Sequence, residues 1–176
     1  MRQFKFSVLC HIFIFFTSIT LSFAAPIPAT GTIEVYFSPR GGATEAVVRE
    51  IAGAKTDILV QAYSFTSVPI AKALLGAHKR GVKVVAVLDK SQRKERYTSA
   101  TFLRNAGIQV LIDERHAIAH NKIMIIDRQS LITGSFNFTK AGEERNAENL
   151  LVMKGNKPLL SQYIRNFEEH LQHSEQ

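Results

Sequence analysis

Two residues of the sequence, His120 and Lys122, combine side chains that suit chemistry at a phosphate group. Alternate residues of a strand face the same side, so a strand over this segment would project both side chains from one face. An imidazole can attack phosphorus as a nucleophile, and an ammonium group can stabilise negative charge on the phosphoryl oxygens. The spacing of this pair therefore predicts a site that binds and cleaves a phosphate ester.

Further polar and small residues follow the pair at short range. Asp127 completes the pattern H-x-K-x4-D, and Gly134, Ser135 and Asn137 follow as G-S-x-N. A glycine allows the backbone to approach a ligand closely, and short hydroxyl and amide side chains offer hydrogen bonds to oxyanions. We expect these residues to extend the same site.

The elements that must position these residues alternate between strands and helices in the first half of the chain. Apolar spacing and Gly or Pro boundaries predict helices at residues 44–54, 68–79, 98–105 and 157–171. Period-two and β-branched runs predict strands at 32–37, 58–63, 82–88, 108–112, 119–126, 131–134 and 149–153. Strand-helix-strand units imply crossovers, so we expect one α/β domain with a mixed, largely parallel central sheet flanked by helices.

The N-terminus differs from the rest of the chain. Two basic residues precede an uncharged apolar run over residues 6–23, and small residues stand where they favour cleavage after Ala24. This layout predicts a secretory signal peptide at 1–24, a domain at 25–176, and a periplasmic or secreted location. A retained membrane anchor is the alternative, because about 18 apolar residues can span a bilayer. The single cysteine, Cys10, lies in this segment, so the mature chain would contain no disulfide.

The chain is basic with or without this leader. It holds 22 basic and 15 acidic residues, and 20 and 15 remain without the first 24, a net charge of +5. Excess positive charge attracts polyanions, which favours nucleic acid or an anionic membrane surface as a partner. A hydrophobic fraction of 45% argues against a disordered chain.

The motif resembles the H-K-D signature of the phospholipase D superfamily. Six positions carry the resemblance: His120, Lys122, Asp127, Gly134, Ser135 and Asn137. The size, the export signal and the single copy of the motif are similar to those of the small bacterial Nuc-type endonucleases of that superfamily.

The resemblance implies phosphodiester hydrolysis without a metal or other cofactor. One histidine forms a covalent phosphohistidine, and a second histidine protonates the leaving oxygen and then activates water. Because this chain has one motif, two copies of His120 would meet in a homodimer with a shared active site. Lys122, Ser135 and Asn137 are carried over as catalytic, and Glu148 matches the carboxylate that fixes the histidine tautomer. Asp127 and Gly134 are expected to support the fold around the motif.

The other histidines have simpler interpretations. His116 and His120 could form an i, i+4 zinc pair, but the segment looks extended and no third ligand is obvious, so we expect no metal site. His116 would then line the groove or lie in a loop. His78, His170 and His173, on predicted helices, are expected to be solvated.

Two basic segments could contact nucleic acid. Arg40 follows the carboxyl end of a predicted strand, where α/β sheets place their ligands. Residues 91–96 form a predicted polar loop in which Arg93, Lys94 and Arg96 could bind phosphates and Tyr97 could stack on a base. A plain solvated loop is the alternative.

Three functions fit the sequence. The first is a secreted, metal-independent endonuclease, non-specific in sequence, that acts on DNA and on RNA as a homodimer. The second is a phospholipid phosphodiesterase that acts on cardiolipin at a membrane, which a retained anchor would favour. The third is a catalytically inactive nucleic-acid-binding protein, although such a protein has no need of the intact His120 and Lys122.

Overall fold

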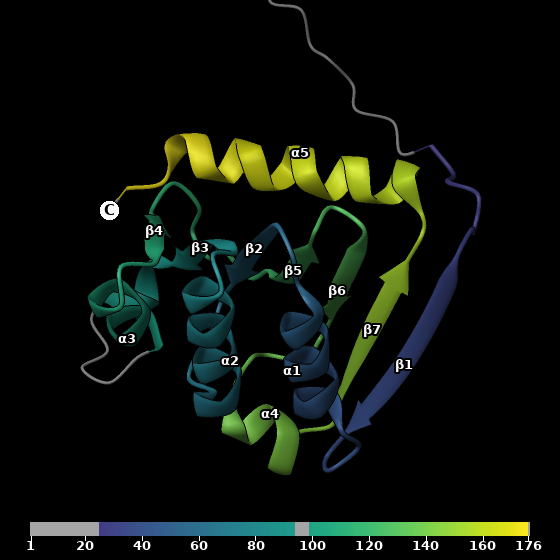
Figure 1. The fold of residues 1–176 in the computed structure, drawn as a ribbon, viewed down its shortest axis with the longest axis horizontal. Coiled ribbons are helices and arrows are strands. Elements are labelled where there is room, and N and C mark those ends of the chain that lie inside the picture. Colours follow the sequence, from purple (N-terminus) through teal and green to yellow (C-terminus); the bar gives the residue numbers. More distant parts are fainter. Residues whose placement is uncertain (1–24, 94–98, 176) are drawn as a thin grey trace, which may run out of the picture.

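A seven-stranded mixed sheet with helices on both faces forms the body of the molecule (Figure 1). The computed structural model describes residues 25–93 and 99–175. The strands are β1 (Thr32–Ser38), β2 (Asp57–Ala62), β3 (Lys83–Asp89), β4 (Gln109–Asp113), β5 (Lys122–Ile126), β6 (Ser130–Gly134) and β7 (Glu148–Lys154). The helices are α1 (Ala43–Gly53), α2 (Val68–Lys79), α3 (Ser99–Asn105), α4 (Lys140–Glu144) and α5 (Lys157–His173), with a short 3-10 helix at Lys90–Arg93.

The strand order is β1-β7-β6-β5-β2-β3-β4, which confirms the mixed α/β sheet. Parallel pairing joins β2 to β3 and β3 to β4, where helices provide the crossovers. The other pairings are antiparallel, so the expected largely parallel character holds for this half alone. The difference arises because β5 and β7 run opposite to their neighbours β2, β6 and β1, so every pairing on that side of β2 is antiparallel.

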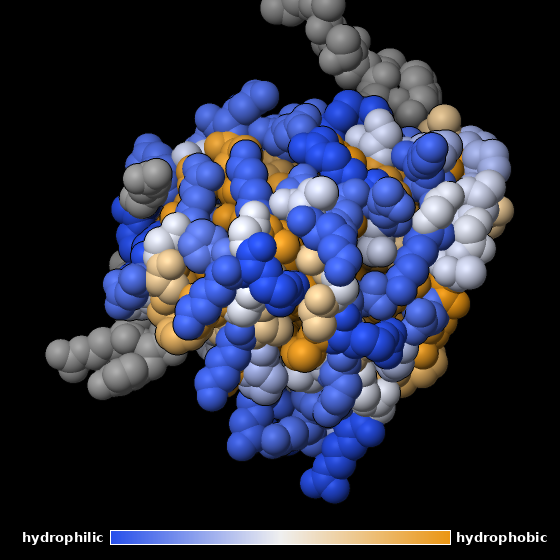
Figure 2. Space-filling model, in the orientation of Figure 1, coloured by the Kyte–Doolittle hydropathy of each residue, from blue (hydrophilic) through white to orange (hydrophobic). Residues whose placement is uncertain are grey.

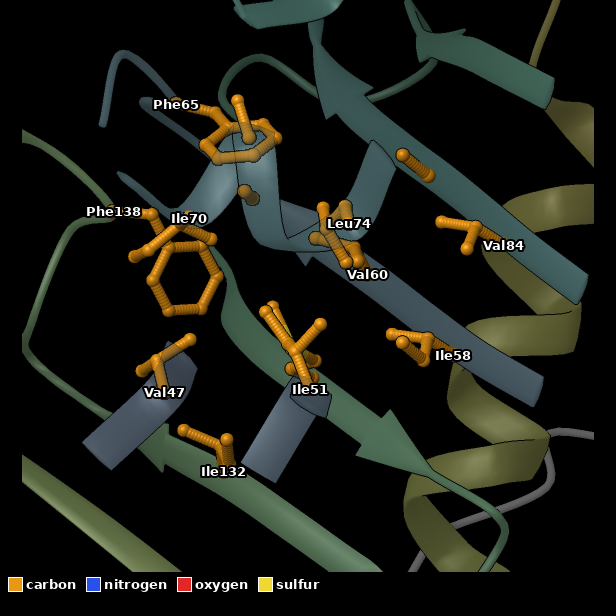
Figure 3. Packing of buried hydrophobic residues seen from close by; sticks show 14 of the residues in the cluster. Val47, Ile51, Ile58, Val60, Phe65, Ile70, Leu74, Val84, Ile132 and Phe138 are labelled. Atoms are coloured by element: carbon orange, nitrogen blue, oxygen red, sulfur yellow. The ribbon is translucent and has the colours of Figure 1, made fainter. Parts of the chain in front are cut away.

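Alternation along the strands divides the core between the two sheet faces. Residues 58, 60 and 62 of β2 belong to the cluster beneath α1 and α2, whereas Leu59 belongs to the cluster beneath α5. Figure 3 shows the first cluster, in which Phe65 and Phe138 meet edge to face beside Ile70. Such close packing makes the sheet a rigid support for side chains at its edges.

The predicted signal peptide and the alternative of a membrane anchor both concern the N-terminal segment. The expected leader, residues 1–24, lies outside the described residues. Among residues 25–93 and 99–175, no helix has both the length and the apolar character needed to cross a bilayer.

Candidate active site

Five adjoining strands of the sheet each have one end along the same edge, the one formed by strand ends. β1, β2 and β6 end there, and β5 and β7, which run antiparallel to them, begin there. In Figure 1 this edge lies near α4, at the bottom of the view. Each candidate catalytic residue lies at one of these strand ends, so segments far apart in sequence supply a single site.

Tyr63, directly after β2, connects the two residues of the central pair. Its ring centroid is 4.6 Å from that of His120, and the Lys122 Nζ lies 5.2 Å from it. The Lys122 ammonium also donates a hydrogen bond of 3.0 Å to the His120 carbonyl oxygen. The imidazole and the ammonium group therefore lie against a common aromatic side chain. Tyr63 was not predicted as a site residue; its aromatic character at a strand's carboxyl end was the available signal.

Lys122 is buried, with 6% of its surface exposed, although it carries the charge that a phosphate would meet. Burial lowers the pKa of the Lys122 ammonium, and the negative charge of Glu148 partly opposes this shift. A buried cation interacts strongly with an incoming anion because little water screens it. This arrangement suits the binding of a phosphoryl group.

His120 differs from its prediction because it lies outside a strand. The strand expected over residues 119–126 begins at Lys122. The Ala119 N–H donates to the buried Asp89 carboxylate at 2.7 Å instead of entering the sheet. Burial opposes ionisation of Asp89, but hydrogen bonds from Ser91 and Ala119 outweigh it and lower the Asp89 pKa. Asp89 thus anchors the loop beside an exposed His120.

Ser135 follows β6 in a tight turn against β7. Its hydroxyl oxygen accepts hydrogen bonds from the Asn149 N–H at 3.0 Å and the Asn149 amide nitrogen at 3.3 Å. Gly134 has φ of 147°, and a Cβ there would lie 2.3 Å from the Asn149 carbonyl oxygen. The turn that presents Ser135 therefore requires glycine at position 134.

Asn137 has a buried side-chain oxygen, Oδ1, that has no hydrogen-bond partner among the described residues. Its backbone carbonyl oxygen is held by the Thr139 N–H at 2.6 Å. The same carbonyl closely approaches Gly142 of α4, where a Cβ would lie 2.5 Å from it. Buried polar atoms are normally paired, so this acceptor oxygen is available to a water molecule or another donor group.

Glu148 begins β7 opposite Ser38 of β1. Its carboxylate accepts a hydrogen bond from the Asn146 amide at 3.1 Å, and its N–H donates to the Ser38 hydroxyl at 3.2 Å. The His120 ring lies against Tyr63, and the implied contact of the Glu148 carboxylate with that ring stays a prediction. Glu148 acts electrostatically on Lys122.

Asp127 lies at the opposite end of β5, away from the other motif residues. Its carboxylate accepts hydrogen bonds from the N–H groups of Lys55, Thr56 and Asp57 at 2.7 to 3.2 Å, and from the Thr56 hydroxyl. Burial opposes ionisation, but these donors outweigh it and lower the Asp127 pKa. The geometry fits a residue that supports the fold.

The structure describes two of the five residues predicted to contact nucleic acid. Arg40 is exposed in the loop after β1, with φ of 60°, and its N–H donates to the Glu143 carbonyl. Arg93 forms an ion pair with Glu114 at 3.2 Å. Lys94, Arg96 and Tyr97 lie outside the described residues.

The prediction of a polar loop at residues 91–96 is wrong for its first part. Lys90–Arg93 forms a 3-10 helix, and Gln92 within it is buried with its side-chain oxygen accepting from the Phe65 N–H at 3.3 Å. The prediction of solvated His170 and His173 is also wrong. Both rings lie close to the buried Asp113, at the far end of the same sheet edge.

An exposed imidazole lies beside a buried ammonium group on this mixed α/β sheet, with the Ser135 hydroxyl and the Asn137 amide on the neighbouring turn, an arrangement that suits chemistry at a phosphodiester. The chain belongs to the phospholipase D superfamily and, within it, to the Nuc-type proteins. Residues 47–171 match the family described as "Cardiolipin synthase, PLD-like domain". The protein is accordingly a phosphodiesterase, a hydrolase of this superfamily.

Individual relatives support this assignment. The chain is 41% identical over 135 residues to "Phospholipase D" of Rickettsia felis, covering 77% of this chain and 67% of that protein. It is 31% identical to the human "Mitochondrial cardiolipin hydrolase", of which it spans 52%. Among solved structures, Nuc from Salmonella typhimurium has a TM-score of 0.79 and 36% identity, covering 82% of this chain and 97% of that one. NucT from Helicobacter pylori, at 20% identity and a TM-score of 0.75, shares the fold.

Proposed function

We propose that this protein is an endonuclease that hydrolyses DNA, and also RNA, without a metal ion in the reaction. The observation that carries the proposal is the exposed His120 beside the buried Lys122, in a chain similar to Nuc over nearly the full length of that protein. A basic chain attracts the phosphate backbone irrespective of sequence, which fits a non-specific nuclease.

The proposed reaction has two displacements at phosphorus. A ring nitrogen of His120 attacks, so that a phosphorus–nitrogen bond forms and the bond to the leaving oxygen breaks. His120 of a second copy of the chain donates a proton to that oxygen. The same imidazole then removes a proton from water, whose oxygen attacks phosphorus and releases the first imidazole.

The remaining groups have roles in binding and orientation. The Lys122 ammonium stabilises the negative charge that grows on the phosphoryl oxygens. Asn137 and Ser135 supply hydrogen bonds at the rim, with the turn at Gly134 holding them in place. The negative charge of Glu148 favours the protonated form of Lys122 and partly opposes the effect of burial, which lowers the Lys122 pKa.

A homodimer would supply the second histidine. Beside the site, the outer face of β1 exposes Ile33, Val35 and Phe37 at 57%, 49% and 67%, a stripe of apolar side chains on an edge strand. Hydrophobic surface is seen at the edge of the molecule along β1 (Figure 2). Exposed apolar patches of this kind favour protein contacts. We propose that this stripe contributes to the dimer interface.

Phospholipid cleavage is the second candidate function. The names of relatives from Rickettsia and from mammals favour it, since they are a phospholipase D and a cardiolipin hydrolase. The two candidates also differ in location. Endonuclease activity fits cleavage of the leader at residues 1–24 and release to the periplasm or medium, whereas lipid activity fits a retained anchor.

A single assay series compares these candidates. Purified protein in excess EDTA would be incubated separately with supercoiled DNA, RNA and cardiolipin vesicles, at a temperature below the melting temperature of the protein. We expect nicking of DNA by the wild type and by His78→Ala, a control on α2, and none by His120→Ala. Turnover of cardiolipin alone would replace the nuclease proposal with the lipid one. Loss of all activity in EDTA, in protein that circular dichroism shows to be folded as before, would contradict metal-independent cleavage.

A further inference from the structure

Three histidines and one aspartate from distant parts of the chain converge beyond the active site. Asp113 ends β4 and is fully buried. His116 lies in the loop that follows, and His170 and His173 lie three residues apart in the last turn of α5, on one face of the helix. Figure 1 shows the carboxyl end of α5 beside β4. One potential ligand atom from each residue lies within 4.8 Å of all the others.

The ring nitrogens surround one carboxylate oxygen, Oδ2 of Asp113. The His170 Nδ1 lies 2.6 Å from it, the His116 Nδ1 2.9 Å, and the His173 Nε2 3.4 Å. The other oxygen, Oδ1, accepts hydrogen bonds from the Arg115 and His116 N–H groups, which fixes the carboxylate.

Hydrogen bonding does not satisfy this group of atoms. The His173 Nε2 is buried and has no hydrogen-bond partner among the described residues, although it faces the Asp113 carboxylate. The His116 and His170 rings stack with centroids 4.6 Å apart. Neutral imidazole nitrogens are common metal ligands. A cation among the nitrogens would give every one of them a partner.

We propose that Asp113, His116, His170 and His173 bind one zinc ion. Three imidazole nitrogens and one carboxylate oxygen form a ligand set that tetrahedral zinc accepts. Zinc–ligand bonds of about 2.0–2.1 Å place tetrahedral ligand atoms about 3.4 Å apart. The four atoms here are at most 4.8 Å apart, so changes of up to about 1.4 Å in their separations would complete the site. With four protein ligands the ion is structural and does not enter the phosphodiester chemistry.

The zinc ion would join the C-terminus to the loop that carries the nucleophile. His116 precedes His120 by four residues, and the loop is held further on by the Ala119–Asp89 hydrogen bond. Beyond α5, Glu175 exchanges backbone hydrogen bonds with Ile112 of β4 at 2.6 and 3.0 Å. The ion would therefore fasten both α5 and residues 114–121 to the end of β4.

Zinc titration of the protein after chelation and dialysis tests the proposal. We expect about one zinc per chain by elemental analysis and a melting temperature higher by about 5–10 °C when zinc exceeds its dissociation constant about a hundredfold. His170→Gln and His173→Gln should lose both effects. His78→Gln, a histidine on α2 outside the cluster, should keep them, and so should His120→Ala, which separates this site from the nuclease proposal.

Two further outcomes keep the test decisive. Cobalt in place of zinc should give the visible absorption of a tetrahedral ion in the wild type, which serves if a variant fails to fold. No binding by the wild type, or equal binding by a folded His173→Gln, would overturn the proposal. In the first case Asp113 would be held by imidazole hydrogen bonds alone.

Discussion

Replacing Asp127 by alanine separates support of the fold from chemistry within the H-x-K-x4-D motif. The change removes the acceptor of hydrogen bonds from the N–H groups of Lys55, Thr56 and Asp57 and from the Thr56 hydroxyl. Hydrogen bonds to a charged group contribute about 1.5–3 kcal/mol each when buried, and partial exposure reduces this to under about 1 kcal/mol. Four such bonds predict a loss of about 2–4 kcal/mol of unfolding free energy.

Urea denaturation followed by circular dichroism measures that loss, with Asp127→Asn as the matched control. Asparagine keeps a side-chain carbonyl oxygen and tolerates the φ of 53° at this position, so it should lose less. The plasmid-nicking rate per folded molecule should stay within about threefold of the wild type in both variants. A folded Asp127→Ala variant slowed by more than about a hundredfold would instead place Asp127 in the chemistry.

The pH dependence gives a second check on Asp127. Because the folded-state pKa is lowered from the ordinary 3.8, the carboxylate contributes stability above that pH and loses it as the pH falls through the folded value. The difference in unfolding free energy between wild type and Asp127→Ala should therefore be constant near neutrality and shrink below about pH 4. A difference independent of pH would mean that the charge of Asp127 is not what stabilises the fold.

Three other changes test the site and its dimer. Lys122→Met should reduce the nicking rate by about a hundredfold or more without loss of stability, and an unchanged rate would contradict the role of Lys122. The wild-type rate should decline with rising pH before pH 10.5, the ordinary lysine pKa, because burial lowers the pKa of Lys122. Gly134→Ala should cost about 2–4 kcal/mol in urea denaturation, because the new Cβ meets the Asn149 carbonyl, and full stability would show that the turn adapts. Phe37→Asp should produce an inactive monomer by sedimentation, and an active dimer would exclude the β1 stripe as the interface.

Helices and strands were predicted well where proline or glycine residues mark their ends in the sequence. The helix expected at residues 68–79 is found with the same bounds, because Pro69 lies in its first turn and Gly81 follows it. By contrast, α4 was missed because five residues are too few for an apolar period. Its signal was Thr139, whose hydroxyl caps the helix by accepting from the Gly142 N–H at 2.9 Å.

Arrangement in space was harder to predict than the elements themselves. Nothing in residues 32–37 indicates that β1 pairs with β7 at the far edge, because that pairing depends on segments more than a hundred residues away. Residues 119–121 were predicted as strand but form a loop, because the Ala119 N–H binds the carboxylate of Asp89, which is distant in sequence. The histidine cluster was missed for the same reason, since Asp113 and His170 are 57 residues apart.

The motif itself needed little from the structure, since His120 and Lys122 are neighbours in sequence. Their surroundings did need it. Tyr63, directly after β2, contacts both residues, and the charge of Glu148 acts on Lys122. Contacts between strand ends depend on strand order, which local patterns do not contain.

Trapping the covalent intermediate tests most directly whether His120 is the nucleophile. The wild type would be mixed with a labelled oligonucleotide in excess EDTA, quenched with denaturant at alkaline pH to preserve the phosphorus–nitrogen bond, and digested for mass spectrometry. We expect a nucleotide adduct on the peptide containing His120, which forms and decays within a turnover and is absent from His120→Asn. Cleavage by the wild type with no adduct on that peptide, or cleavage by His120→Asn at the wild-type rate, would contradict the assignment of His120 as the nucleophile.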